Sequence, residues 1–147
     1  MKLDVKKRLK SDYAHFVSVP TRWMDNDVYG HVNNVNYYSY FDTVVNGFLI
    51  GGGALDIHKG PVIGLVVETH CKYFASLSFP ETVTAAIGVS KIGNSSVRYE
   101  IGLFAEGEHK PAAQGYFVHV YVDRETRRPT SLPERLKSLL ETILLSE

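Results

Sequence analysis

The feature that most constrains this chain is a long aromatic run between Asn34 and the triple glycine at 51–53. Its large apolar side chains recur at helical spacing, and its small polar side chains fall on another face. An asparagine at position 33 or 34 is placed to cap the first turn, because its side-chain oxygen can accept a hydrogen bond from a free amide. The glycines favour a helix end. The sequence therefore predicts a buried helix from about residue 34, with the core positions Tyr37, Phe41, Val44 and Phe48.

Segments with strand-like alternation stand on both sides of this helix. In the stretch 62–74 the alternation places Ile63 and Leu65 on one face and Glu68 on the other. Gly93 and Asn94 form a turn signal between two later strands, which favours a hairpin. One antiparallel sheet with a helix packed on it is an α+β fold. The predicted strands are 15–23, 62–74, 81–92, 97–107 and 112–122.

Length, charge and cysteine content limit the class of protein. We predict a single domain over residues 1–147, with 1–14 as a solvated lead-in and 131–147 as a C-terminal helix. Sixteen basic residues balance sixteen acidic ones, so charge gives no reason to expect nucleic acid or a membrane surface as a partner. Cys71 is the only cysteine, which excludes a disulfide within the chain. No apolar run reaches the roughly 20 residues that cross a bilayer, and no signal peptide is recognisable, so we expect a cytoplasmic protein.

Polar residues crowd the loop just before the predicted helix. Asp25, Asp27, Gly30 and His31 all lie there, and such residues are most often turn formers and caps. A carboxylate beside the unpaired amides of a first helical turn also suits acyl transfer, because those amides can stabilise an oxyanion on a substrate carbonyl. Asp27 would attack a thioester carbonyl or hold the water that does, and His31 could orient a group or carry a proton.

The stretch RWMDNDVYGHVNNVNYYSYF resembles the signature of hotdog-fold thioesterases of the 4-hydroxybenzoyl-CoA thioesterase type, including their acyl-CoA and acyl-carrier-protein relatives. The shared pattern is D-x-D, a glycine, H-V-N-N and an aromatic pair. Similarity extends through VVETHCKYFASLSFPETV, AAQGYFVHVYVD and RRPTSLPERLKSLLE. This resemblance implies a hotdog fold, in which a curved antiparallel β-sheet wraps around a long central α-helix. It also implies a homodimer or homotetramer with active sites at the subunit interface.

The same resemblance assigns roles to individual residues. Asp27 would be the general base or nucleophile, and the backbone amide at about Asn34 would polarise the thioester carbonyl. His31 would be a further catalytic contact, and Tyr37 would belong to the core and to the wall of the acyl pocket. Glu68 would either reach the substrate across the subunit interface or form an ion pair there. The expected substrate is an acyl-CoA or acyl-carrier-protein thioester, with no metal and no separate cofactor, coenzyme A being part of the substrate.

Three other functions stay open at this point. Hotdog-fold enoyl-CoA hydratases and dehydratases also pair an acid with a histidine, but their motif has asparagine and proline between the two, and DVYGH has neither. The residues Asp25, Asp27 and His31 could supply oxygen and nitrogen ligands to a metal ion. The chain could also be an acyl-binding module without catalysis, although the retained Asp27 favours an enzyme.

Overall fold

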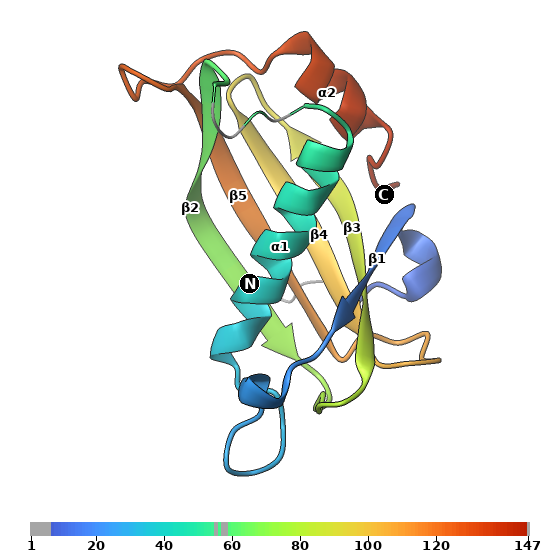
Figure 1. The fold of residues 1–147 in the computed structure, drawn as a ribbon. Coiled ribbons are helices and arrows are strands. Elements are labelled where there is room, and N and C mark those ends of the chain that lie inside the picture. Colours follow the sequence, from blue (N-terminus) through green and yellow to red (C-terminus); the bar gives the residue numbers. More distant parts are fainter. Residues whose placement is uncertain (1–6, 55, 57–58, 147) are drawn as a thin grey trace, which may run out of the picture.

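A five-stranded antiparallel sheet curls around one long helix, which lies across its concave face (Figure 1). The structure, a computed structural model, describes residues 7–54, 56 and 59–146. The strands follow the order β1-β3-β4-β5-β2, so β1 and β2 form the two edges of the sheet. The predicted α+β class and hotdog arrangement are therefore confirmed. The strands are β1 (His15–Pro20), β2 (Val62–Tyr73), β3 (Thr82–Ile92), β4 (Ser96–Phe104) and β5 (Ala113–Asp123). The helices are α1 (Val35–Gly51), α2 (Glu134–Glu141) and the short 3-10 segments η1 (Lys10–Asp12) and η2 (Trp23–Asp25).

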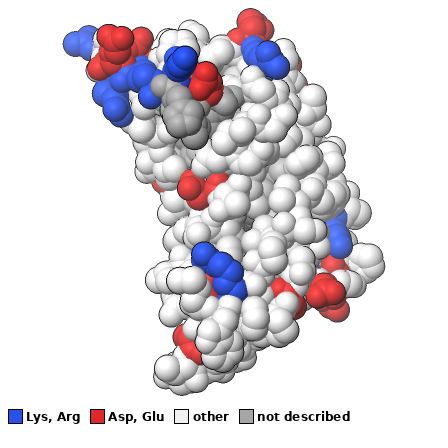
Figure 2. All heavy atoms as spheres, viewed as in Figure 1, with Lys and Arg blue, Asp and Glu red and all other residues white. Residues whose placement is uncertain are grey.

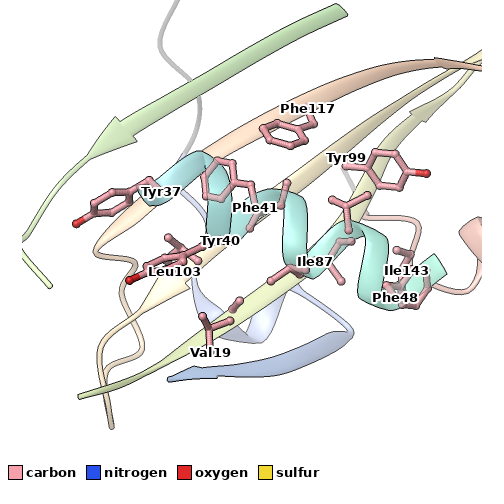
Figure 3. Close-up of a cluster of buried hydrophobic side chains, with 14 of the residues drawn as sticks. Val19, Tyr37, Tyr40, Phe41, Phe48, Ile87, Tyr99, Leu103, Phe117 and Ile143 are labelled. Atoms are coloured by element: carbon pink, nitrogen blue, oxygen red, sulfur yellow. The ribbon is translucent and has the colours of Figure 1, made fainter. Parts of the chain in front are cut away.

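Helix α1 forms the centre of the core, as its aromatic spacing predicts. All four predicted core positions are buried, and each large side chain removed from water contributes about 1.5–3 kcal/mol before entropy is counted. The ring of Phe41 meets that of Phe117 on β5 with centroids 5.6 Å apart. Figure 3 shows the aromatic side chains of α1 among side chains of the sheet. Just after the helix, Gly53 takes a positive φ of 71°, which glycine adopts without strain.

Strand β2 does not keep the strict alternation that we predicted. A β-bulge shifts its register against β5 between Val66 and Glu68. The extra residue exchanges the two faces beyond it, because side chains alternate with a period of two. Glu68 therefore lies on the outer face of the sheet together with Ile63 and Leu65, and the prediction that it lies opposite them was wrong.

The described part of the N-terminal segment packs against the outer face of the sheet. Tyr13 is buried there, and the Arg8 side chain donates a hydrogen bond to the buried Glu100 carboxylate across 3.1 Å. We predicted a solvated lead-in over 1–14. The difference arises because this segment brings an aromatic ring and a counter-charge to the sheet. Residues 1–6 lie outside the described part of the chain.

The C-terminal helix is shorter than the predicted 131–147. After Glu141 the chain leaves the helix and runs beside β3, where the Val89 N–H donates to the Ile143 carbonyl over 2.9 Å. The Leu145 N–H donates in turn to the Val89 carbonyl over 2.8 Å. The pairing of β1 with β3 extends only to Ile87, so this part of β3 has backbone groups that the tail satisfies.

The surface carries few charged side chains across the middle of the face that Figure 1 presents (Figure 2). Most of the charged groups visible in that view lie toward the two ends of the molecule. Within the described residues, none of the helices combines the length and the apolar character required to span a bilayer.

Candidate active site

Asp25 ties the polar loop to helix α1. Its carboxylate is 1 % exposed and accepts hydrogen bonds from the Tyr40 hydroxyl at 2.7 Å and from Arg22 Nη2 at 2.9 Å. Its backbone carbonyl accepts from the Asn33 N–H at 2.8 Å and from Asn36 Nδ2 at 3.0 Å. Burial raises the pKa of Asp25, but the hydrogen bonds from Tyr40 and Arg22 outweigh it, so the pKa lies below its ordinary value. Asp25 thus supports the loop as an ionised group.

Asp27 lies in a small closed loop that orients its carboxylate. The Asp27 N–H donates to the His31 carbonyl at 2.8 Å, and the Gly30 N–H donates back to the Asp27 carbonyl at 3.1 Å. Gly30 closes this loop with a φ of 81°, a conformation that favours glycine. The carboxylate oxygen Oδ1 accepts from the Tyr29 N–H at 2.9 Å and, more weakly, from the His31 N–H at 3.4 Å. Among the described residues, Oδ2 has no hydrogen-bond donor.

The first turn of α1 presents an unpaired backbone amide. Asn33 provides the predicted cap, because its Oδ1 accepts from the Val35 N–H at 3.1 Å and its carbonyl accepts from the Asn36 N–H at 2.9 Å. Asn34 itself makes no side-chain cap. Within the described chain the Asn34 N–H has no hydrogen-bond acceptor. A free amide at the positive end of a 17-residue helix can receive negative charge from a ligand.

Two hollows flank the polar loop. One, of about 350 Å³, contains three of the predicted site residues, His31, Asn34 and Tyr37, beside the segment that follows β2. The other, of about 540 Å³, contains Asp27 together with Gly30. The structure therefore brings His31, Asn34 and Tyr37 together in one hollow and places Asp27 in the other. Gly30 of the second hollow is the chain neighbour of His31 of the first.

Glu68 lies apart from both hollows. Its Oε2 accepts a hydrogen bond from the Tyr116 hydroxyl at 2.5 Å on the outer face of the sheet. This contact raises the pKa of Tyr116. Within one chain the bulge in β2 thus turns Glu68 away from the helix start, and a role at the thioester is not supported by this position.

Several residues at the hollows were missed by the sequence reasoning. Tyr73, at the end of β2, packs its ring edge-on against that of Tyr37 with centroids 4.9 Å apart. Trp23, Met24 and Val28 line the Asp27 hollow, and Val28 is 94 % exposed. Exposed apolar side chains clustered in this way are typical of a surface that binds a ligand or another protein. Their presence within an otherwise polar loop was the signal that could have pointed to them.

The metal site considered for Asp25, Asp27 and His31 is not supported by the geometry. Both oxygens of Asp25 are already engaged by Arg22 and Tyr40. In the described ranges no group of three or more His, Cys, Asp or Glu side chains is arranged to hold an ion.

A long helix enclosed by a curved five-stranded antiparallel sheet defines the hotdog fold. The chain belongs to the thioesterase-like superfamily, whose family model matches residues 19–140.

Solved structures of other proteins share this fold. The chain is 49 % identical to the PA5185 protein of Pseudomonas aeruginosa PAO1, with a TM-score of 0.93 over 96 % of this chain and 99 % of that one. PA2801 of the same organism, a candidate thioesterase, is 25 % identical, with a TM-score of 0.80 over 86 % of this chain and 97 % of its own. The SAV2348 protein of Staphylococcus aureus, crystallised in complex with CoA, shares the fold at 19 % identity, with a TM-score of 0.79 over 96 % of this chain and 87 % of that chain.

Proposed function

We propose that this protein is an acyl-CoA thioesterase, which hydrolyses a thioester to a free acid and the thiol of coenzyme A. The observation that carries the proposal is the unpaired Asn34 amide at the start of a buried helix, next to the Asp27 loop. An amide in this position is suited to an oxyanion, because its dipole already points at the place where negative charge develops. A Staphylococcus aureus protein of the same fold binds CoA, which supports a CoA thioester as substrate, with an acyl-carrier-protein thioester as the second choice.

In this proposal Asp27 and Asn34 act on the same carbonyl group, the Asn34 amide on its oxygen and Asp27 on its carbon. The amides of Tyr29 and His31 hold Oδ1 of Asp27, which leaves Oδ2 to attack the carbonyl or to take a proton from the attacking water. The thioester would lie across the Gly30–His31 peptide, which links a residue of one hollow to a residue of the other. His31, exposed at the edge of the Asn34 hollow, would contact the thioester or the leaving thiol. The sole cysteine makes no disulfide within the chain, which is consistent with a cytoplasmic enzyme.

We further propose a homodimer in which the β2 strands of two copies pair antiparallel. Strand β2 is an edge of the sheet, and Leu65, Val66 and Val67 in its middle are exposed, Val67 to 60 %. An apolar edge strand leaves backbone groups and apolar surface that a second copy can cover, and two such dimers could assemble into a tetramer. Light scattering should give at least twice the chain mass for the wild type and the mass of one chain for Val67→Lys. A dimeric Val67→Lys protein would contradict pairing at this edge.

The catalytic assignment is tested by removing one backbone N–H. Asn34 has a φ of −58°, which proline adopts, and proline is well tolerated in the first turn of a helix. Asn34→Pro therefore deletes an amide that has no partner in the folded chain. We expect kcat for thiol release from a panel of acyl-CoA substrates to fall by about 100-fold, with an unchanged Tm. Asn34→Ala, which keeps the N–H, is the matched control and should retain activity.

Asp27→Asn tests the acid in the same assay. We expect a loss of about 100-fold or more, because a carboxamide is a poor base and nucleophile. Equal hydrolysis by Asn34→Pro and Asn34→Ala would refute the oxyanion assignment. Undiminished hydrolysis by both Asp27→Asn and Asn34→Pro would place the catalytic site elsewhere. Acyl-CoA binding by the wild type without thiol release above the uncatalysed rate would indicate a binding module. Loss of the conjugated absorbance of an enoyl-CoA without thiol release would indicate a hydratase.

A further inference from the structure

A third cavity lies between the second half of α1 and the strands β2 and β5, away from the polar loop. It has a volume of about 280 Å³ and shares no residue with the two hollows beside that loop. This volume is sufficient for a small ring or a short chain. Its wall is partly apolar and partly polar, and includes Asn46, Ile63, Gly64, His119, Tyr121 and Arg124.

His119 is the unusual group in this wall. It is 4 % exposed and surrounded by the rings of Tyr99, Phe117 and Tyr121. Burial lowers the pKa of His119 to about 4, so the imidazole is neutral near pH 7. Neither ring nitrogen has a hydrogen-bond partner among the described residues, and Nε2 is fully enclosed. A buried polar group without a partner at a position that a phenylalanine could fill calls for an explanation.

The other nitrogen of His119, Nδ1, faces the β2 side of the cavity. A β-carbon on Gly64 would stand 3.3 Å from Nδ1 and 2.8 Å from the Tyr121 ring, so the absence of a side chain at Gly64 keeps this space open. Asn46 lies on the α1 side, where its Nδ2 donates to the Asp42 carbonyl at 3.0 Å. The Asn46 carbonyl oxygen has no donor among the described residues. The cavity therefore offers an imidazole nitrogen and an amide oxygen to a hydroxyl group.

The position of this cavity becomes informative when β2 pairs with a second copy. Asn46 is twelve residues beyond Asn34 along α1, or about 18 Å at 1.5 Å per residue, so the cavity is remote from the thioester site of its own chain. Tyr73, at one end of β2, lines the Asn34 hollow, whereas Ile63 and Gly64, at the other end, line the His119 cavity. When two copies pair antiparallel about the middle of β2, the Tyr73 end of one copy lies beside the Ile63–Gly64 end of the other.

We propose that the His119 cavity of one subunit receives the far end of the acyl group whose thioester lies at the Asn34 amide of the other subunit, and that it selects acyl groups carrying a terminal hydroxyl. This inference rests on the proposed thioesterase function and on the β2-paired dimer. A hydroxyl group can donate to one of the two free acceptors or accept from the imidazole N–H, whichever nitrogen carries the proton. A purely hydrocarbon end leaves these groups unpaired, which disfavours it.

The test uses thioesters that differ by one isosteric change. We would measure kcat/KM for 6-hydroxyhexanoyl-CoA against heptanoyl-CoA, and for 4-hydroxyphenylacetyl-CoA against 4-methylphenylacetyl-CoA. The wild type should prefer the hydroxylated member of at least one pair by about tenfold. His119→Phe should bring that ratio to one or below while heptanoyl-CoA is still hydrolysed. His109→Phe, which replaces an exposed histidine in the segment between β4 and β5, is the control and should keep the wild-type ratio. A wild-type ratio near one, or a preference retained in His119→Phe, would overturn the inference.

A binding measurement separates failure of this inference from failure of the proposed function. If no thioester is hydrolysed by the wild type, the proposed function fails and the acyl-selecting role fails with it. The cavity itself is then judged by the imidazole NMR signals of His119, identified by their loss in His119→Phe. We expect 4-methylphenol to shift these signals and 1,4-dimethylbenzene to leave them unchanged. Equal effects of both probes, or no effect of either, would show that the cavity does not recognise a hydroxyl group.

Discussion

Replacing His119 by phenylalanine should make the fold less sensitive to acid. The pKa of the imidazole is about 4 in the folded chain, whereas an imidazole in an unfolded chain titrates near 6.5. Below pH 6.5 the unfolded chain thus binds a proton that the folded chain refuses, and stability is lost progressively until the pH reaches about 4. This difference in pKa between the folded and the unfolded chain lowers the free energy of unfolding by about 3 kcal/mol in total. About 2 kcal/mol of this loss falls between pH 7 and pH 4.5.

Urea unfolding of the wild type and His119→Phe at pH 7 and pH 4.5 measures this effect. The free energy of unfolding of the wild type should fall by about 2 kcal/mol more than that of the variant over this interval. At pH 7 the variant should be at least as stable, because the change removes a buried nitrogen without a partner and keeps an aromatic ring. His119→Gln, which is polar but does not titrate, should show the same reduced pH dependence as His119→Phe. Equal losses for the wild type and both variants would refute the account of His119 as a neutral buried group.

Three further changes test how the sheet and the polar loop are held. Gly115→Ala should destabilise the fold by about 3 kcal/mol or prevent folding, because a β-carbon there would overlap the Phe41 ring on α1. A melting temperature of the variant equal to that of the wild type would contradict this. Asp25→Ala should cost about 2 kcal/mol in chemical denaturation, since it leaves the buried Tyr40 hydroxyl without its acceptor, and an unchanged denaturation midpoint would show that the loop is held by other contacts. Glu68→Gln should change kcat/KM by less than about twofold, and a large loss would place Glu68 at the substrate after all.

The sequence anticipated much of the candidate site because its signals are local. The Asn33 cap and the bare amide at Asn34 follow from where a helix begins, and they are present as expected. In the structure the Asp25 carboxylate is bonded to Arg22 and Tyr40, whereas the catalytic role of Asp27 stays a prediction. Pattern reasoning could not find Tyr73, because its contact with Tyr37 joins the end of β2 to the first turn of α1 across more than thirty residues of sequence.

By itself the sequence determined the long aromatic helix, the strands and the loop between them, because periodicity and capping act over a few residues. The tertiary structure alone decided which face Glu68 occupies, since a single bulge in β2 reverses the alternation beyond it. It also decided that Glu100 is buried beneath the N-terminal segment, and that His119 stands unpartnered beside a cavity. These outcomes depend on contacts between residues far apart in the chain, and no local pattern encodes them.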